Sequence, residues 1–483
     1  MIRIQNLIDG RMVDPAGDAW LDDVNPATGE VFARVPDSGA DDINAAVEAA
    51  QRAFPAWAAM PAADRSQLLL RLAGLIDANL DRLAEAESRD TGKPLWLAKS
   101  VDIPRAATNF RFFATAILHT RSDLHDTDGK ALNYTLRAPR GVAGCISPWN
   151  LPLYLFSWKV APALATGNTV VGKPSEVTPL SAWMMSELIN EAGFPPGVFN
   201  IVHGHGARAG AAITAHPGVP TITFTGGTAT GAEIQRVAGP MFKKISLELG
   251  GKNPTVIFAD CDLDRTLRET KRAAFSNQGQ ICLCGSRILV ERKIYSQFVE
   301  RFVADVKKIR VGDPMDEATR MGALVSRAQL EKVSYYIKLA QEEGGTIACG
   351  GSRPEGLPAH VANGFYLSPT VITGLPQACR TNREEIFGPV ASVIPFDTED
   401  EAIAAANDTP YGLAASVWTR DLTRAHRVAA RIDAGTVWVN CWMLRDLRVP
   451  FGGMRQSGVG REGGDEALRF FTEPKNVCVQ LGE

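Results

Sequence analysis

The stretch GVAGCIS, residues 141–147, is a short run of small and apolar residues, and it is the first of a series. Similar runs follow at helix-length intervals: GNTVVGK (167–173), GVFNIVHG (197–204), TITFTGG (221–227) and KKISLELGG (243–251). Short β-rich runs that alternate with helical segments indicate a mostly parallel, doubly wound sheet. We therefore expect an α/β fold.

A second series of β-rich runs begins after Gly251. Its members are TVIFAD (255–260), SRILVER (286–292), PVASVIPF (389–396), AASVWT (414–419) and GTVWVN (435–440). A chain of 483 residues exceeds what one hydrophobic core usually supports. Two doubly wound α/β lobes are the simplest account, with the seam near residues 248–251.

Three further segments flank these series. Residues 41–89 are helical in pattern, with leucines recurring on one face. Residues 122–140 are polar and then alternating, which predicts a loop feeding a strand or hairpin that projects from the first lobe. The end, FFTEPKNVCVQLGE (470–483), predicts one isolated strand after a helix. Such a strand needs an edge to pair with, and a neighbouring subunit could supply it.

The composition excludes several classes of protein. With 45% hydrophobic residues, 22% charged residues and a net charge of -3, the chain is that of a globular protein without the basic surplus that nucleic acid requires. The N-terminal sequence lacks a targeting pattern, and no apolar run is long enough to span a membrane, so we expect a soluble, cytoplasmic protein. The eight cysteines form no Cys-x-x-Cys pair, which favours reduced thiols and no metal.

Two glycine-rich turns are candidate nucleotide sites. HGHGARAG (203–210) nearly matches the dinucleotide fingerprint, but its last glycine comes one residue late. FTGGTATG (224–231), with Gly226, Gly227 and Gly231, also follows a strand and opens a helix, where backbone N–H groups could face a pyrophosphate. Either run could instead be an ordinary tight turn between a strand and a helix.

The segment GKPSE (172–176) places Lys173 and Glu176 at the end of a predicted strand. A carboxylate there can accept both hydroxyls of an adenosine ribose and repel a 2'-phosphate, which favours NAD over NADP. The alternative is a solvated ion pair between the two side chains.

The segment NQGQICLCGSR (277–287) holds two cysteines separated by one leucine. A free cysteine can be a nucleophile or simply a small buried hydrophobe. Alternation in an extended segment would point both sulfurs to the same side, so the residues alone do not choose between Cys282 and Cys284.

Six motifs together resemble the aldehyde dehydrogenase superfamily, in order and over essentially the whole chain. They are SPWNLPL (147–153), GKPSE, FTGG, LELGGKNP (247–254), NQGQICLCG (277–285) and EEIFGPV (384–390). The resemblance implies a Rossmann-like NAD-binding lobe (1–121 and 141–248), a catalytic lobe (249–440) and a small bridging oligomerisation element (122–140 and 465–483). It also implies a homo-oligomer, either a dimer or a tetramer.

The resemblance assigns the chemistry of aldehyde oxidation to three residues. Cys282 is the family nucleophile, whose thiolate adds to the aldehyde so that the resulting thiohemiacetal can expel hydride, and Cys284 becomes a packing residue. The side-chain amide of Asn150 and the backbone N–H of Cys282 resemble the oxyanion hole. Glu248 matches the general base that activates water against the thioester, and coenzyme-A-acylating relatives typically lack it.

Other family positions match as well. Glu385 and Phe387 resemble the pair that binds the nicotinamide ribose and packs near the ring, and Glu462 matches a carboxylate sometimes assigned to proton relay. Gly227 departs from the family, where serine is usual, so one contact to the pyrophosphate is missing. The expected NAD contacts are Trp149, Lys173, Glu176, Gly226, Gly227, Gly231, Leu249, Glu385 and Phe387.

Two arginines narrow the substrate. Arg105 lies in DIPRAATNFRFF (102–113) and Arg445 in NCWMLRDLRVPFGG (440–453). These segments resemble the branch that oxidises 2-hydroxymuconate or 2-aminomuconate 6-semialdehyde in the catabolism of aromatic compounds, in which an arginine pair grips the substrate carboxylate. Arginine presents a planar fork matched to that group. Alternatively, Arg105 is a helix-surface charge and Arg445 pairs with Asp446.

The remaining expectations concern the walls of the site and the rival functions. Trp442, Tyr154 and Leu153 are candidate apolar walls for a flat diene, whereas Arg448 and Arg111 are expected to be structural. A dehydrogenase for betaine aldehyde or a general aliphatic aldehyde is the first rival, although two arginines would repel a cation. A catalytically idle nucleotide-binding homologue is the second.

Overall fold

The computed structural model describes residues 1–482, and its larger sheet has eight strands. They lie in the order β22 (Gly458–Val459), β12 (Lys244–Glu248), β11 (Thr221–Thr225), β8 (Val142–Ile146), β9 (Thr169–Lys173), β10 (Phe199–Ile201), β2 (Asn6–Ile8) and β3 (Arg11–Val13). The five strands from β12 to β10 are parallel. These five are the runs from which the sequence predicted the first lobe.

Helices cover both faces of this sheet, which is why its central strands, β8 to β11, are fully buried. All five residues of β8 are buried. Ala143 and Cys145 belong to the core that holds α2 (Ala62–Ala78), α5 (Ile103–Ala116), α6 (Pro152–Ala165) and α7 (Leu180–Ala192). Val142 and Ile146 belong to the other core, with α1 (Ala40–Ala59), α8 (Ala211–Ala215) and α9 (Thr228–Ala238). The doubly wound class is confirmed.

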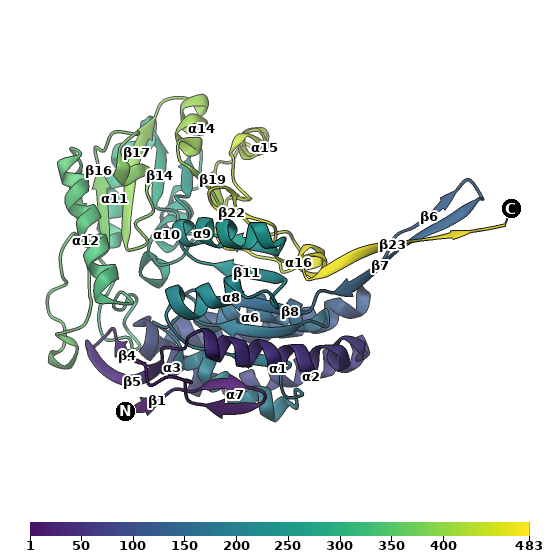
Figure 1. The fold of residues 1–483 in the computed structure, drawn as a ribbon. Helices are drawn as coiled ribbons and strands as arrows, with labels where there is room; N and C mark the ends of the chain where they lie inside the picture. Colours follow the sequence, from purple (N-terminus) through teal and green to yellow (C-terminus); the bar gives the residue numbers. More distant parts are fainter. Residues whose placement is uncertain (483) are drawn as a thin grey trace.

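The second sheet has seven strands. Their order is β15 (Thr346–Cys349), β16 (Thr370–Thr373), β17 (Val390–Phe396), β14 (Arg287–Glu291), β13 (Pro254–Ile257), β19 (Ala414–Trp418) and β20 (Thr436–Val439), and only β15 is antiparallel to its neighbour within the described sheet. Its two cores hold α10 (Leu263–Phe275) with α11 (Arg292–Val306), and α14 (Glu399–Asn407) with α15 (Leu422–Arg431). Both lobes are visible in Figure 1.

Short elements complete the two lobes. They are β1 (Ile2–Arg3), β4 (Trp20–Asn25), β5 (Glu30–Pro36), α3 (Leu80–Thr91), α4 (Leu95–Leu97), α12 (Arg327–Glu342), α13 (Arg380–Arg383), β18 (Tyr411–Gly412), β21 (Met454–Arg455) and α16 (Gly464–Phe470). In residues 1–482 no helix combines the length and the apolar character needed to cross a membrane.

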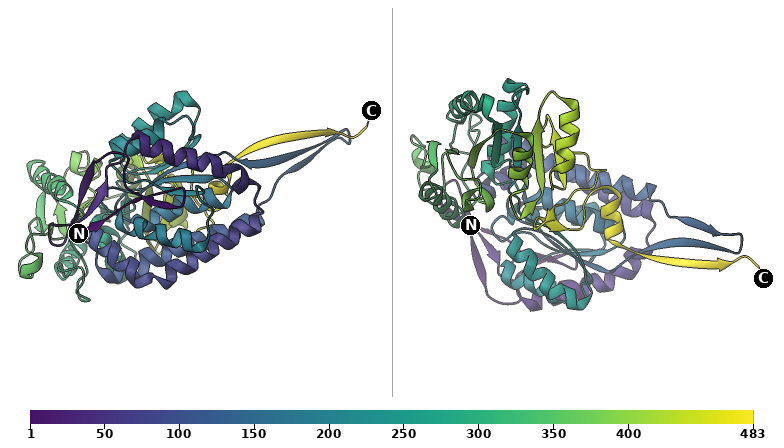
Figure 2. Two further views of the ribbon diagram at one scale, coloured as in Figure 1. Left: turned by 60° about the horizontal axis from the view of Figure 1, so that its bottom comes forward. Right: turned by 90° about the horizontal axis from the view of Figure 1, so that it is seen from above.

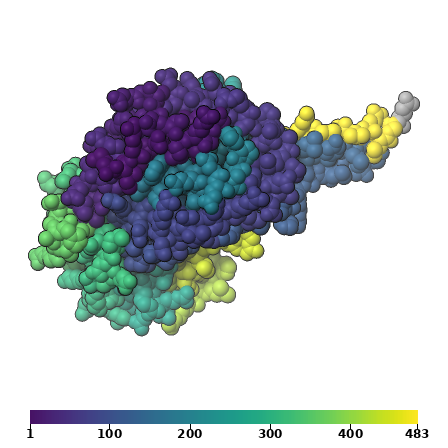
Figure 3. Space-filling view, turned by 90° about the horizontal axis from the view of Figure 1, so that it is seen from below, coloured from purple at the N-terminus to yellow at the C-terminus, as the bar shows by residue number. Residues whose placement is uncertain are grey.

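A three-stranded arm projects from the body of the molecule (Figures 1 and 2), and the space-filling view shows it as a thin extension (Figure 3). It consists of β6 (Leu124–Thr127), β7 (Ala131–Pro139) and β23 (Thr472–Gln480). The expected hairpin therefore exists. The expectation that a neighbouring subunit supplies the edge for the last strand was wrong, because β23 pairs with β7 of the same chain along its whole length.

The strand ends of the first sheet position the site. β8, β11 and β12 are adjacent and parallel, so their carboxyl ends lie at one edge. Asn150 follows β8, Gly226 follows β11, and Glu248 is the last residue of β12. Ligands of open α/β sheets bind at this kind of edge.

Candidate active site

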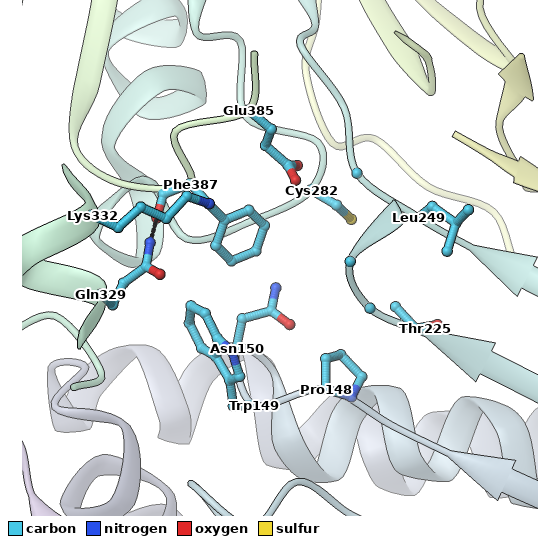
Figure 4. Close-up of a pocket in the computed structure, with 13 residues that line it drawn as sticks. Pro148, Trp149, Asn150, Thr225, Leu249, Cys282, Gln329, Lys332, Glu385 and Phe387 are labelled. Carbon is cyan, nitrogen blue, oxygen red and sulfur yellow. Dashed lines mark hydrogen bonds between the residues drawn. The ribbon is translucent and has the colours of Figure 1, made fainter. Parts of the chain in front are cut away.

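A cavity of about 200 Å³ lies at the carboxyl edge of the first sheet. In Figure 4 the side chains of Asn150, Cys282 and Glu385 point into it from three separate segments of the chain. Its lining consists of Pro148, Trp149, Asn150, Thr225, Gly226, Gly227, Leu249, Gly250, Cys282, Gln329, Lys332, Glu385 and Phe387. The cavity thus gathers residues from both lobes.

A second, narrower cavity of about 20 Å³ meets the first. Its lining consists of Leu151, Tyr154, Leu155, Trp158, Thr225, Glu248, Ile281, Cys282, Leu283, Met443, Arg445, Phe451 and Glu462. Cys282 and Thr225 belong to both linings. The thiol of Cys282 is therefore accessible from a glycine-lined cavity on one side and from a largely apolar one on the other.

The two cysteines of the nucleophile loop are not equivalent. Residues 281–283 form a bend and turn, so the segment is not extended and the expected alternation of side chains was wrong. Cys284 lines neither cavity, and its sulfur lies 4.0 Å from the carbonyl oxygen of Ser276. The local backbone therefore separates the two sulfurs.

Three consecutive left-handed residues shape this loop. Asn277, Gln278 and Gly279 have φ angles of 51°, 56° and 68°. The Gln278 amide donates a hydrogen bond of 2.9 Å to the carbonyl of Ala323, which holds the first part of the run. A Cβ on Gly279 would lie 2.1 Å from the carbonyl oxygen of Gly388, so only glycine fits there.

Asn253 fixes the other end of the loop. Its amide nitrogen donates to the carbonyl oxygens of Cys282 and Cys284, at 2.7 Å and 2.9 Å. Its amide oxygen accepts from the backbone N–H of Ala414 at 3.0 Å. Because Asn253 is buried, these three bonds join the nucleophile loop rigidly to β13 and β19.

Burial raises the pKa of the Cys282 thiol, and the carboxylates of Glu385 and Glu248 raise it further. The positive charge of Arg445 acts in the opposite direction. The thiol therefore needs a proton acceptor to become a thiolate, and ionised Arg445 favours that change.

Asn150 is held in place beside the thiol. Its amide nitrogen donates to the carbonyl of Gln280 at 2.9 Å, which ties it to the nucleophile loop. The backbone carbonyl of Asn150 accepts from the side-chain amide of Asn277, at 3.0 Å, and from the ammonium of Lys93, at 3.2 Å. A primary amide has two hydrogens, so the second can face a developing oxyanion in the cavity.

Glu248 ends β12 and lines the narrower cavity with Cys282. Its Oε1 atom is buried and has no hydrogen-bond partner among residues 1–482. Burial raises the pKa of Glu248 well above its usual value, and the neighbouring Glu462 adds to this increase. A carboxylate with a raised pKa is a stronger base once ionised, which suits proton abstraction from water.

Glu462 forms a buried network behind Glu248. Its Oε1 accepts from the ammonium of Lys159 at 2.9 Å and from the Thr223 hydroxyl at 3.2 Å. Lys159 is fully buried on α6 and also donates to Thr223 at 3.1 Å. The network supplies groups that can exchange protons beside the expected base.

The residues expected to contact NAD fall into two groups. Trp149, Gly226, Gly227, Leu249, Glu385 and Phe387 line the larger cavity. Lys173, Glu176 and Gly231 do not. Lys173 forms an ion pair with Glu176 at 3.0 Å, as in the alternative interpretation, but the pair is largely buried and not solvated. Gly231 permits close packing of α9 on β12, because a Cβ there would lie 2.5 Å from Leu249.

The glycine-rich runs also separate. HGHGARAG forms a turn of π-helix (Gly206–Gly210) outside both cavity linings, whereas FTGG contributes Gly226 and Gly227 to the larger one. Gly227 precedes α9, and nothing lies within 4 Å of where its Cβ would be. This open helix N-terminus can take an anionic group such as a pyrophosphate.

Glu385 and Phe387 meet the cavity from the second lobe. Glu385 accepts a hydrogen bond of 2.8 Å from the backbone N–H of Gly251, which spans the seam. The Phe387 ring lies edge-on to Trp149, with 5.2 Å between ring centroids. Both residues line the larger cavity and form one wall of it.

Of the two substrate-binding candidates, Arg445 is among the residues that line the narrower cavity and Arg105 is not. Arg445 lines it, and its guanidinium lies 3.9 Å from the centroid of the Phe451 ring. Arg105, on α5, lies 5.2 Å from the ring centroid of Tyr154, another lining residue. Neither arginine has an ion-pair partner within the part of the chain that the structure describes. The alternative pairing of Arg445 with Asp446 was wrong, because Asp446 pairs with Arg448.

Of the other residues expected near the substrate, Tyr154 lines the narrower cavity, and Trp442 and Leu153 do not. Trp442 instead donates to the carbonyl of Leu283 at 3.0 Å and so supports the nucleophile loop. Arg111 pairs with Asp77, consistent with a structural role.

Several residues of the site were not predicted. Lys159 lies in an apolar helical sequence that is typical of a buried core helix. Only the presence of a charged residue in that sequence indicates a buried partner. Asn253 follows a glycine pair typical of a turn, and Gln329 with Lys332 lies on α12, far from any motif. Lys93, beside the expected oxyanion residue, forms a buried ion pair with Asp102.

Comparisons with known proteins agree with this geometry. Residues 12–477 match the model of the aldehyde dehydrogenase family. The chain is 53% identical to the 2-aminomuconic semialdehyde dehydrogenase of Danio rerio, over 99% of this chain and 98% of the other. It is 48% identical to the 2-hydroxymuconic semialdehyde dehydrogenase of Pseudomonas sp. strain CF600, over the full length of both. An NAD+ complex of an aldehyde dehydrogenase from Bacillus cereus superposes with a TM-score of 0.96 at 42% identity, covering 99% of this chain and 97% of that one.

Proposed function

The chain belongs to the aldehyde dehydrogenase family, and within it we propose that this enzyme oxidises a carboxylated semialdehyde with NAD. The substrate is 2-hydroxymuconate or 2-aminomuconate 6-semialdehyde and the product is the dicarboxylic acid. The observation that carries the proposal is the position of Cys282, where a glycine-lined cavity meets a narrow one lined by Arg445, an arginine without an ion-pair partner in residues 1–482. The relatives that act on these semialdehydes match over the full chain.

The first half of the reaction forms a covalent adduct. The Cys282 thiolate adds to the aldehyde carbon, and the carbonyl oxygen becomes an oxyanion that accepts hydrogen bonds from the Asn150 amide and the Cys282 N–H. NAD would supply the acceptor for the hydride that this carbon loses. Loss of hydride leaves a thioester on Cys282, in which the former aldehyde carbon is at the oxidation level of an acid.

The second half releases the acid. Glu248 takes a proton from water, the hydroxide oxygen bonds to the thioester carbon, and the C–S bond breaks so that the Cys282 sulfur leaves as thiolate. We assign to the Lys159–Glu462 pair the transfer of the proton from Glu248 onward. The buried network supports this assignment, since Glu462 is close enough to raise the pKa of Glu248.

We propose that the larger cavity holds the nicotinamide half of NAD, between Phe387, Trp149 and the nucleophile loop. Glu385 would bind the ribose, and the α9 N-terminus with Gly227 would face the pyrophosphate. Lys173 and Glu176 would bind the adenosine ribose. Glu176 retains one oxygen outside the Lys173 contact, directed toward His205 at 3.4 Å, so its carboxylate is not fully used by the ion pair.

Arg105 and Arg445 would hold the distal carboxylate of the substrate. Each lies near an aromatic ring, at 5.2 Å and 3.9 Å from the ring centroid, and neither is neutralised by a carboxylate in residues 1–482. Charged hydrogen bonds of this kind contribute about 1.5 to 3 kcal/mol each. Arg445→Ala should therefore raise KM for the carboxylated substrate by about 10- to 150-fold. An unchanged KM would remove Arg445 from the site.

The decisive assay follows absorbance at 340 nm with NAD, 2-hydroxymuconate semialdehyde and an uncharged aldehyde of similar length. We expect a strong preference for the carboxylated aldehyde. Equal rates would contradict the binding of the substrate carboxylate by Arg105 and Arg445. A higher rate with betaine aldehyde would contradict the assignment of a positively charged substrate site. Absence of turnover with every aldehyde would leave the chain an idle homologue.

We further propose the lobe division of residues 1–121 with 141–248, 249–440, and an oligomerisation element of 122–140 with 465–483. The projecting arm supports the last, because two of its three strands have an unpaired edge that a second subunit could cover. We propose a homo-oligomer on this basis. A cytoplasmic location is supported by the eight cysteines, all of them free thiols.

A further inference from the structure

The loop that carries Arg445 is anchored on both sides by backbone contacts. The Trp438 indole donates to the carbonyl of Leu444 at 3.0 Å, and the N–H of Gly464 donates to the carbonyl of Leu447 at 2.8 Å. Arg445 therefore leaves a fixed backbone, and its half-buried side chain lines the narrower cavity, with the guanidinium 3.9 Å from the centroid of the Phe451 ring. A carboxylate next to it in the loop would compete for this guanidinium.

The adjacent residue supplies such a carboxylate. Asp446 follows Arg445 directly, and an aspartate beside an arginine competes with any substrate carboxylate for the same guanidinium. In the structure this competition does not occur, because the Asp446 carboxylate is paired with Arg448. The Arg448 backbone N–H and Nε each donate to Oδ1 at 2.9 Å, and Nη2 donates to Oδ2 at 2.5 Å.

From this arrangement we infer that Arg448 is a positioning residue for substrate specificity. By holding Asp446 in a turn of three residues, it keeps that carboxylate away from Arg445 and leaves the Arg445 guanidinium available to the substrate carboxylate. The inference rests on the proposed function, since it presumes that Arg445 binds the substrate.

The same arrangement affects the chemistry. The charge of Arg445 lowers the pKa of the Cys282 thiol and of Glu248, against the larger effect of burial. If Asp446 paired with Arg445, the charge of Arg445 would lower the pKa of the Cys282 thiol less, and the thiolate would form only at higher pH. Specificity and thiol reactivity therefore should change together when Arg448 is lost.

The test compares Arg448→Gln, Asp446→Asn and the double variant. In Arg448→Gln the ratio of kcat/KM for 2-hydroxymuconate semialdehyde over an uncharged aldehyde should fall about two- to fivefold, the effect of one exposed ion pair. The pH profile of Cys282 alkylation by iodoacetamide should move to higher pH. The double variant should recover both values, because no carboxylate remains to compete. Arg236→Gln, which breaks an exposed pair with Glu233 elsewhere, is the matched control.

Two results would overturn the inference: an unchanged ratio in Arg448→Gln, or a loss that the double variant does not recover, which would indicate a merely collapsed loop. Arg445→Gln separates this failure from that of the proposed function. If Arg445→Gln lowers the ratio and Arg448→Gln does not, only the role of Arg448 is refuted. If Arg445→Gln leaves the ratio unchanged, the substrate assignment fails as well.

Discussion

Replacing Asn253 by alanine should release the loop that carries the nucleophile. The change removes three hydrogen bonds, of 2.7, 2.9 and 3.0 Å, to the carbonyls of Cys282 and Cys284 and the N–H of Ala414. A buried neutral hydrogen bond contributes about 1 kcal/mol net. Two of the three bonds join Asn253 to the loop, so their sum is about 2 kcal/mol, which raises the equilibrium for local opening of the loop by about thirtyfold.

Hydrogen–deuterium exchange with mass spectrometry measures this opening directly. In the peptide 277–287 the N–H groups of Cys284 and Gly285 are bonded to the carbonyls of Ile281 and Ala273, so their exchange reports the opening. We expect their exchange to accelerate by about thirtyfold and kcat to fall with it, while the peptides of β8 to β12 exchange as before.

Asn382→Ala is the matched control. This asparagine is equally buried, but it donates a single bond of 2.9 Å, to the carbonyl of Pro376. It should leave exchange in residues 277–287 unchanged. If the exchange rates of residues 277–287 in Asn253→Ala stay within about threefold of those in the parent protein, the loop is held by its own left-handed turn. The reasoning from Asn253 would then be refuted.

Three other perturbations test the site. Cys282→Ala should abolish NADH formation and Cys284→Ala should keep most of it, because only the first sulfur lines the cavities; equal losses at 340 nm would contradict the assignment. Glu462→Gln should move the rising limb of the kcat–pH profile to lower pH, because the Glu462 carboxylate raises the pKa of Glu248 and the base acts only when deprotonated. A rising limb that moves to higher pH would exclude Glu248 as the base. Gly279→Ala should destabilise the loop by at least about 1–2 kcal/mol because of its left-handed backbone, and the new Cβ should displace Gly388, so the protein should fold but lose activity. The control Gly74→Ala, with open space around its Cβ, should be active. An active Gly279→Ala variant would show that the loop tolerates another shape.

Much of the architecture follows from the alternation of short apolar runs with helical segments. Each run from 141 to 251 became a strand of the first sheet, because strands covered on both faces carry no polar alternation to obscure them. Parallel strands also bring their ends to one edge, so Asn150 and Glu248 lie at the same edge of the sheet although almost a hundred residues separate them.

What could not be predicted depends on long-range partners. Lys159 is acceptable in an apolar helix only because Glu462, some three hundred residues later, is adjacent to it. The pairing of β23 with β7 depends likewise on two segments at distant positions in the chain. The separation of Cys282 from Cys284 depends on the bend and turn at residues 281–283, which follow left-handed angles at Asn277 and Gln278. That conformation is uncommon for glutamine, so the sequence does not predict it.

The left-handed turn before Cys282 limits how this catalytic loop can be transplanted. Its shape depends on the carbonyls of Ala323 and Gly388 and on the amide of Asn253, which come from three other segments. The sequence 277–285 placed on a different scaffold would lack these partners, and its backbone would relax to ordinary angles. An engineer who wants this thiol in a new enzyme would have to move a shell of neighbouring backbone with it.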